Sequence, residues 1–152
     1  MLGVTGPNEY ENNVNNNFYT NYIAKWCMEF TLQTLNEIKD VDNTRYNEVI
    51  TKTKLTKQEI DAIKLMTKSV YFPYSEALDI YLQQDGFLDK KLTPVSDLNT
   101  NDRPINQHWS WDRILRSPYI KQADVLQAFY FFEDCFSIEE LKKHFDFYEP
   151  LT

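Results

Sequence analysis

The chain has 152 residues, of which 42% are hydrophobic and 26% are charged, and these values fit one ordinary globular domain. Its formal net charge of −7 excludes a general nucleic-acid binder, which needs a basic face, and gives no support for binding to an anionic membrane surface. The sequence has no signal peptide and no apolar run of membrane-spanning length, so we expect a cytoplasmic location.

Cysteine and histidine are too sparse to build a disulfide framework or a metal site. Cys27 and Cys135 do not form a framework in a chain of this size, and we expect both to be buried thiols. No pair of these residues has metal-ligand spacing, so the sequence predicts neither a metal nor a cofactor. The aromatic share of 15% fits either a ring-lined ligand cleft, of which sugar clefts are a common case, or a core rich in rings.

Hydrophobic periodicity and helix-capping signals predict a mostly helical chain. After a loop over residues 1–20, apolar side chains recur at three- and four-residue steps, which is typical of one helix face. Thr56 with Glu59 and Ser137 with Glu140 are capping boxes, and each marks the start of a helix. Helices are therefore expected over residues 21–39, 57–69, 109–115, 122–133 and 138–146.

The segments between these helices are long and rich in aromatic residues. Residues 40–54 are expected to form a connection with some helix, and residues 88–108 a loop. Residues 78–82 predict one short strand, which must pair elsewhere or lie along a helical body because a single strand makes no sheet. Long ordered loops between helices favour an α/α toroid over a small helical bundle, in which connections are short.

The helix expected over residues 122–133 is apolar around most of its circumference. In a soluble protein such a helix must be covered on several sides. If the chain is a piece of a larger domain, we expect apolar side chains of this helix to be exposed.

Glu9 is the first candidate for chemistry. Pro7 stiffens the backbone before it, and Asn8 and Tyr10 flank it with a carboxamide and a ring. A carboxyl held against aromatic groups loses hydration, so its pKa rises and it can act as a general acid near neutral pH. The other interpretation is a solvated loop glutamate that caps a turn. The asparagines that follow could hold sugar hydroxyls, or could simply cap helices and permit unusual turns.

Lys121 and Gln122 are the second candidates, because they open the apolar helix. Polar groups at a buried helix start need hydrogen-bond partners, and the hydroxyls of a ligand could supply them. In the other interpretation Lys121 extends to solvent and Gln122 caps the helix.

The third candidate segment runs from Trp109 to Arg113. Asp112 next to Arg113 suggests a structural ion pair. The tryptophans could be platforms for a sugar, but we expect Trp109 and Trp111 to lie in the core. Neither a Ser-His-Asp or Cys-His nucleophilic arrangement nor a glycine-rich phosphate loop has support in the sequence.

Several groups of residues, in the order in which they occur, resemble glycoside hydrolase family 65. The first group is similar to the catalytic-acid motif of that family, and the resemblance covers essentially the whole chain. The matching segments are Thr5–Tyr10, Asn13–Asn17, Tyr19–Asn21, Gln84–Phe87, Arg116–Val125 and Phe145–Pro150.

The resemblance implies an internal fragment of a catalytic (α/α)6 barrel over residues 1–152, with no second domain. It implies that Glu9 is the general acid that protonates the glycosidic oxygen. Lys121 and Gln122 would hold hydroxyls of the glucose at the cleaved bond. The family contains phosphorylases of maltose, trehalose, kojibiose and nigerose and some trehalose hydrolases, and the pattern is most similar to the members that act on maltose. It further implies a homodimer for the full-length enzyme.

The implied reaction is maltose plus inorganic phosphate giving β-glucose 1-phosphate and glucose, with inversion. An inverting hydrolase needs a second carboxylate to activate water, whereas phosphate is already anionic and can attack directly. In the family the phosphate-binding segment follows the Glu149–Pro150 region, so we expect it outside this chain. We therefore expect negligible activity from the chain alone. A sugar-binding module without catalysis is the alternative from another class.

Overall fold

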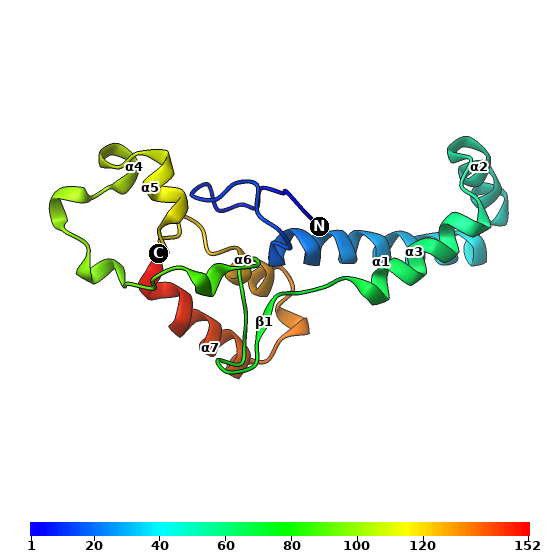
Figure 1. Cartoon of the computed structure of the whole chain (residues 1–152). Coiled ribbons are helices and arrows are strands. Elements are labelled where there is room, and N and C mark those ends of the chain that lie inside the picture. Colours follow the sequence, from blue (N-terminus) through cyan, green and yellow to red (C-terminus); the bar gives the residue numbers. More distant parts are fainter. The chain divides into compact units, whose positions relative to one another are not determined.

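The computed structural model describes all 152 residues, and most of them are helical (Figure 1). The α-helices are α1 (Phe18–Val41), α2 (Asn43–Thr53), α3 (Lys57–Ser69), α4 (Ile105–His108), α5 (Trp111–Arg116), α6 (Asp124–Phe131) and α7 (Ile138–Tyr148). The strands are β1 (Tyr74–Ser75) and β2 (Ile80–Tyr81), and the 3-10 helices are η1 (Phe87–Asp89), η2 (Val95–Asp97), η3 (Thr100–Asp102), η4 (Glu133–Cys135) and η5 (Glu149–Leu151). The expected all-α class with at most two short strands is confirmed. None of the helices has both the length and the apolar character that crossing a membrane requires.

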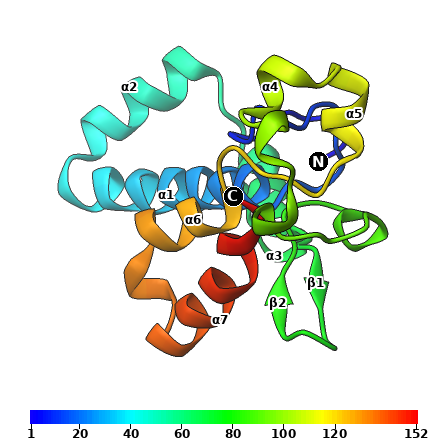
Figure 2. The ribbon, with the colours of Figure 1, turned by 90° about the vertical axis from the view of Figure 1, so that its left-hand side faces the viewer.

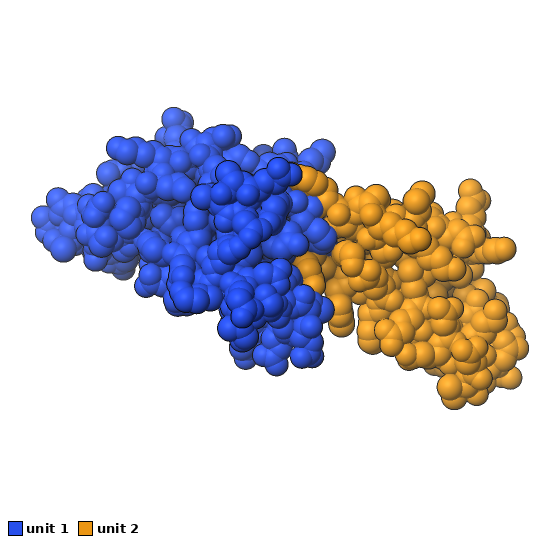
Figure 3. Space-filling model, turned by 90° about the horizontal axis from the view of Figure 1, so that it is seen from below, with its two compact units in different colours: residues 1–21, 72–152 blue, residues 22–71 orange.

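The chain divides into two compact units (Figure 3). Unit 1 contains residues 1–21 and 72–152, and unit 2 contains residues 22–71. Helix α1 begins in unit 1 and continues into unit 2. All three candidate segments for chemistry lie in unit 1.

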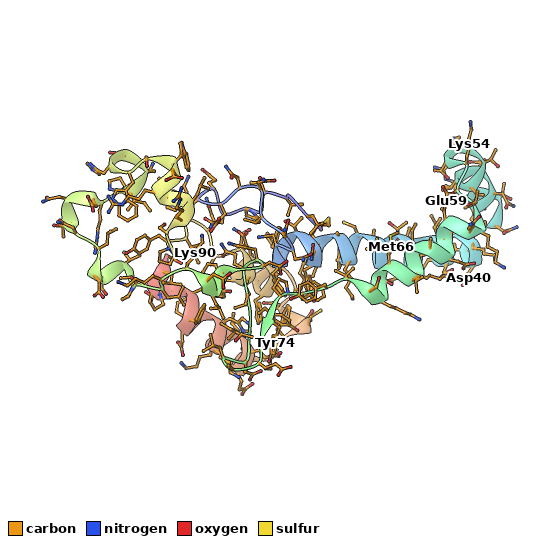
Figure 4. All side chains as sticks on the ribbon, in the orientation of Figure 1. Asp40, Lys54, Glu59, Met66, Tyr74 and Lys90 are labelled. Carbon is orange, nitrogen blue, oxygen red and sulfur yellow. The ribbon has the colours of Figure 1, made fainter.

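Unit 2 consists of the rest of α1 together with α2 and α3, and local capping explains its helices. The side chain of Asp42 caps α2 by accepting a hydrogen bond from the Arg45 backbone N–H at 3.0 Å. The predicted capping box of Thr56 and Glu59 is present at the start of α3, close to Lys54, which ends α2 (Figure 4). Residues 40–54 are thus more ordered than expected, because a cap converts this polar segment into an 11-residue helix.

Unit 1 contains an antiparallel two-stranded ribbon beside α7 (Figure 2). Tyr74 pairs with Tyr81 and Ser75 with Ile80, so the strand expected over residues 78–82 pairs with the segment immediately before it. Asp79 adopts a left-handed φ of 54° in the intervening turn. The partner strand is only two residues long and carries no alternation that the sequence could reveal.

Helix α6 is shorter than the predicted helix over residues 122–133. It begins at Asp124, because the preceding Ala123 has an extended backbone with φ −77° and ψ 93°. Lys121 and Gln122 therefore lie in the turn before the helix and not in its first turn. On the last turn of α6 Tyr130 is 76% exposed and Phe131 is 60% exposed, which confirms the expected exposure of apolar side chains here.

Three burial predictions are wrong. Cys27, in α1, and Cys135, in the short 3-10 helix η4, are both exposed. Trp111 is also 59% exposed at the start of α5. Trp109 does pack against the cluster of Ile105, Ile114 and Tyr119, as expected. The Arg113 guanidinium carbon also lies over the Trp109 ring, 3.6 Å from its centroid.

Candidate active site

The N-terminal loop of unit 1, residues 1–17, is held by its own backbone and by asparagine side chains. Val4 and Val14 exchange two backbone hydrogen bonds of 2.8 and 2.9 Å, which closes the loop. Asn13 and Asn16 adopt left-handed φ angles of 54° and 52°, a conformation that asparagine tolerates better than most residues. These two asparagines therefore shape turns, which is one of the two roles considered for them.

Glu9, Lys121 and Gln122 come together at the tip of this loop, although Glu9 and Lys121 are 112 positions apart in the chain. The Lys121 ammonium donates to Glu9 Oε2 at 2.5 Å, and the Gln122 carboxamide donates to Glu9 Oε1 at 3.2 Å. The Gln122 Oε1 atom in turn accepts a hydrogen bond from the Glu9 backbone N–H at 3.1 Å. All the residues predicted for the site thus share one hydrogen-bonded cluster.

Asn8 joins the same two segments from the buried side. Its side chain is only 1% exposed. Its Oδ1 atom accepts hydrogen bonds from the Lys121 backbone N–H at 2.9 Å and from the Tyr10 backbone N–H at 3.3 Å. The backbone on either side of Glu9 is therefore tied to the turn that carries Lys121 and Gln122. Sequence reasoning treated Asn8 only as a polar neighbour of the acid.

The electrostatics of Glu9 are opposite to the sequence-based expectation. The pKa of Glu9 is lowered, first because Lys121 donates a hydrogen bond to the carboxylate and also because of its positive charge. The carboxyl stays largely hydrated, since its side chain is 61% exposed, and desolvation is a smaller effect than the contact with Lys121. Tyr10 does not cover it, because that ring packs against the cluster of Ile105, Ile114 and Tyr119. In this structure Glu9 is a carboxylate paired with an ammonium.

A mostly apolar cavity of about 300 Å³ adjoins this cluster within unit 1. Lys121 stands between the two, since it pairs with Glu9 and also lines the cavity. Tyr10, Ile105, Tyr119 and Leu151 form much of the remaining wall. The cluster therefore offers a carboxyl, an ammonium and a carboxamide next to a concave surface, and such groups can bind hydroxyls and move a proton.

A second ion pair connects the N-terminal loop to the segment that follows η1. Glu11 is 8% exposed and accepts a hydrogen bond from Lys90, which follows η1. Burial lowers the pKa of Lys90 to about 8. Nearby, the Asp85 side chain accepts from Asn16 at 2.7 Å. The segment around Gln84–Phe87, which carries part of the family resemblance, thus holds the loop in place.

The ion pair expected between Asp112 and Arg113 is not formed. Arg113 lies 3.7 Å from Asp102, and Asp112 pairs instead with Arg116 at 2.7 Å. Consecutive residues of a helix point in different directions, whereas residues four apart lie on the same face. No group of three or more histidine, cysteine, aspartate or glutamate side chains in the structure could hold a metal ion.

Comparison with known proteins matches the whole chain to one family. The sequence model of the glycosyl hydrolase family 65 central catalytic domain matches residues 1–152. The chain is 51% identical over 150 residues to the maltose phosphorylase of Bacillus subtilis. This match covers 99% of the chain and 19% of that protein. The chain is 40% identical over 149 residues to the alpha,alpha-trehalose phosphorylase of Thermoanaerobacter brockii. That match covers 98% of the chain and 19% of the relative.

The solved structures agree. A human-microbiome protein provisionally named as a kojibiose phosphorylase superposes with a TM-score of 0.86 at 32% identity, over 100% of this chain and 21% of that one. The chain spans about one fifth of the length of the relatives it matches.

Proposed function

This chain belongs to the central catalytic domain of glycosyl hydrolase family 65, and from that membership we propose that it supplies the acid and part of the glucose site of an inverting disaccharide phosphorylase. The observation that carries the proposal is the convergence of Glu9, Lys121 and Gln122 in one hydrogen-bonded cluster. Maltose is the proposed substrate, because a maltose phosphorylase is 51% identical to the chain. Trehalose, kojibiose and nigerose are the alternatives within the family.

The proposed reaction transfers a glucosyl group from the second sugar to phosphate. Protonated Glu9 donates its proton to the glycosidic oxygen while an oxygen of hydrogen phosphate bonds to the anomeric carbon from the opposite face. The bond between the anomeric carbon and the glycosidic oxygen breaks, and its electron pair stays on the protonated oxygen of the departing glucose. The proton carried by the attacking phosphate is released and restores Glu9, so β-glucose 1-phosphate and glucose are the products.

In this proposal, substrate binding raises the pKa of Glu9 by weakening its ion pair with Lys121. A carboxylate beside an ammonium holds no proton near neutral pH, and the lowered pKa of Glu9 reflects that pairing. A glucose hydroxyl that accepts a hydrogen bond from Lys121 draws the ammonium away from Glu9. The pKa of Glu9 then rises toward its ordinary value, so a larger fraction of the acid is protonated in the complex in which the proton is needed.

A single carboxyl suffices for this chemistry, because phosphate brings its own negative charge and needs no base to activate it. We propose inorganic phosphate as the co-substrate and no cofactor. The phosphate site, the rest of the barrel and a homodimer interface are proposed to lie in parts of the enzyme outside these residues. We therefore expect the isolated segment to have negligible activity.

The test uses the complete enzyme that contains this segment. Glucose release is measured with maltose, trehalose, kojibiose and nigerose, each with and without phosphate. Phosphate-dependent release from maltose, with β-glucose 1-phosphate as the second product, is the expected result. Release that is equal with and without phosphate would show a hydrolase, and phosphate-dependent release from another of the sugars would replace maltose as the substrate.

A further inference from the structure

A buried carboxyl lies beneath the proposed site. Asp124 is the first residue of α6 and is separated from Gln122 only by Ala123. Asp124 is only 1% exposed to solvent, and its Oδ2 atom accepts a hydrogen bond from the Asn17 carboxamide at 2.7 Å. Its backbone N–H also donates to the side-chain oxygen of Gln83 at 3.3 Å. Two segments far from Asp124 in the sequence thus meet at this residue.

Asn17 uses all of its hydrogen-bonding capacity at this position. Its side-chain nitrogen donates both to Asp124 and to the Gln83 carbonyl oxygen, the latter at 3.2 Å. Its side-chain oxygen accepts from the backbone N–H and the hydroxyl of Thr20, at 2.9 and 2.8 Å, at the start of α1. Asn17 therefore fixes the end of the N-terminal loop to Asp124.

Gly6 rests directly on the hydrogen bond between Asp124 and Asn17. A Cβ atom at this position would lie 2.3 Å from Asp124 Oδ2 and 2.5 Å from the Asn17 carboxamide nitrogen, far inside contact distance. The loop can approach this closely only because Gly6 has no side chain. Two residues further along, the Asn8 backbone amide lies near enough to the Asp124 carboxyl to contribute to lowering its pKa. The backbone that leads to Glu9 is thus seated on Asp124.

Burial of the Asp124 carboxyl lowers the stability of the fold. Burial raises the pKa of Asp124 to about 7, and the hydrogen bond from Asn17 and the nearby Asn8 backbone amide only partly oppose that effect. None of the groups that shift it is a cation. A buried carboxyl without a cation destabilises a fold relative to a neutral side chain of the same shape. Its position is therefore better explained by the geometry that it imposes than by stability.

We propose that Asp124 is a positioning residue, which seats the backbone of Gly6 and Asn8 so that Glu9 lies at the correct distance from Lys121 and Gln122. This inference rests on the proposed function, because it assigns a role toward the acid Glu9. Lys121 and Gln122 are joined covalently to α6 through Ala123, whereas the Glu9 loop depends on noncovalent contacts. Loss of the Asp124 carboxyl therefore displaces Glu9 more than it displaces the groups proposed to bind glucose.

The test compares two donors in the complete enzyme with phosphate as acceptor. Maltose needs a proton on its leaving group, whereas α-glucosyl fluoride does not, because fluoride departs as an anion. Asp124→Ala is expected to lower kcat for maltose by about 10²-fold, the size of effect that a misplacement of about 1 Å can cause, with a much smaller change in KM. Activity on α-glucosyl fluoride is expected to remain within a few-fold.

Further variants keep the outcome interpretable. Asp124→Asn retains an oxygen that can accept from Asn17 and is expected to rescue most of the activity on maltose. Gly6→Ala places a methyl group against the carboxyl and is expected to reproduce the selective loss on maltose if Asp124→Ala does not fold. Because both substitutions disturb the same contact between the loop and Asp124, their losses in the double variant are expected to be less than additive.

Ile80→Ala, which creates a cavity under the ribbon, is the control for a general loss of stability and is expected to affect both donors equally. An equal loss on both donors for Asp124→Ala and Gly6→Ala overturns the positioning role. If Glu9→Gln leaves activity on maltose intact, the proposed function itself fails. If Glu9→Gln is inactive on maltose while both Asp124→Ala and Gly6→Ala are fully active, only the inference about Asp124 fails.

Discussion

The two compact units are stabilised in different ways. Nine of the ten buried polar or charged side chains belong to unit 1, and the tenth, Thr67, belongs to unit 2. Unit 2 otherwise buries only Leu35 fully, and side-chain caps define the starts of α2 and α3. Most of the buried polar side chains make hydrogen bonds, although single atoms of Asn8, Gln83, Gln84 and Asp124 have no partner. Unit 1 is therefore specified largely by the geometry of individual hydrogen bonds. Such precision suits a site for chemistry, whereas unit 2 has the features of a scaffold.

The largest expected effect comes from removing Glu9, the proposed proton donor of unit 1. Glu9→Gln is expected to lower kcat for maltose phosphorolysis by about 10²- to 10⁴-fold, the contribution typical of a general acid, while activity on α-glucosyl fluoride is retained. Initial rates with both donors provide the measurement.

Glu59→Gln is the matched control in unit 2. Glutamine can fill the same position of a capping box, so this variant is expected to retain its activity on both donors. A comparable loss in the Glu59 variant would remove the distinction between a catalytic unit and a scaffold.

The next prediction concerns the pairing of Glu9 with Lys121. Because Lys121 lowers the pKa of Glu9, Lys121→Met is expected to raise that pKa toward the ordinary value of a glutamate. The protonated fraction of Glu9 then increases at every pH near neutrality. Carbon-13 NMR of the Glu9 carboxyl during a pH titration measures the shift.

Lys143→Met is the control for this titration. Lys143 lies elsewhere in unit 1 and lowers the pKa of Asp79 through a side-chain hydrogen bond. This variant is expected to raise the pKa of Asp79 and leave Glu9 unchanged. If both variants move Glu9 equally, the shift does not come from the contact between Lys121 and Glu9.

A smaller effect is expected at His144, which links α7 to the ribbon. Its Nε2 atom accepts from the Tyr81 backbone N–H at 2.8 Å, and its Nδ1 atom lies 2.7 Å from the Glu140 carbonyl oxygen. Nε2 must therefore be unprotonated, and burial is the main reason why the pKa of His144 is lowered. Because the folded pKa lies below the unfolded one, this contribution to stability is complete above the unfolded pKa and declines as the pH falls through the folded pKa.

Hydrogen exchange of the Tyr81 amide tests this prediction. Its protection, corrected for intrinsic exchange, is expected to fall between about pH 7.5 and about pH 5, the range in which histidine ordinarily titrates. Asp124 has a raised pKa and therefore contributes in the opposite direction over part of this range, so the informative quantity is the difference from His144→Gln. Unchanged Tyr81 protection across the range in the unmodified enzyme would contradict the prediction.

The smallest effects are expected at the two capping boxes, one in each unit. Ser137→Ala in unit 1 and Thr56→Ala in unit 2 are each expected to cost about 1 kcal/mol of helix stability, because each leaves a backbone N–H without its side-chain partner. Amide exchange is expected to accelerate only in α7 for the first variant and only in α3 for the second. Acceleration across both units from either variant would show that they do not unfold as separate regions.

Local signals were sufficient to predict much of this structure. Both capping boxes, the long first helix and the last helix follow from neighbouring residues, and the structure confirms them. The convergence of Glu9, Lys121 and Gln122 followed from the family resemblance, because no local pattern connects residues so far apart. Their proposed roles remain to be tested by the experiments above.

The remaining features depend on tertiary contacts that single-sequence patterns do not contain. The direction of the pKa shift at Glu9 was predicted wrongly, because Tyr10 packs into a cluster of distant residues instead of covering the acid. The late start of α6 and the burial of Asp124 depend on contacts with Asn17 and Gln83. An aspartate just after Lys121 and Gln122, at the start of an apolar helix, was the available signal for Asp124.

The long sequence separation of the site contacts has a consequence for how the protein folds during synthesis. The helices of unit 2 make their contacts within residues 22–71, so they can pack together before Asp124 has been made. The loop that carries Glu9 is made before unit 2, but it cannot complete its contacts until Asp124, 107 positions after Asn17, has also emerged. Until then the side chain of Asn17 lacks its hydrogen bond to Asp124, and that of Asn8 lacks its hydrogen bond from the Lys121 backbone. A loop that is made before unit 2 thus reaches its final structure after it, and a pause in translation before Asp124 would prolong the exposure of this loop.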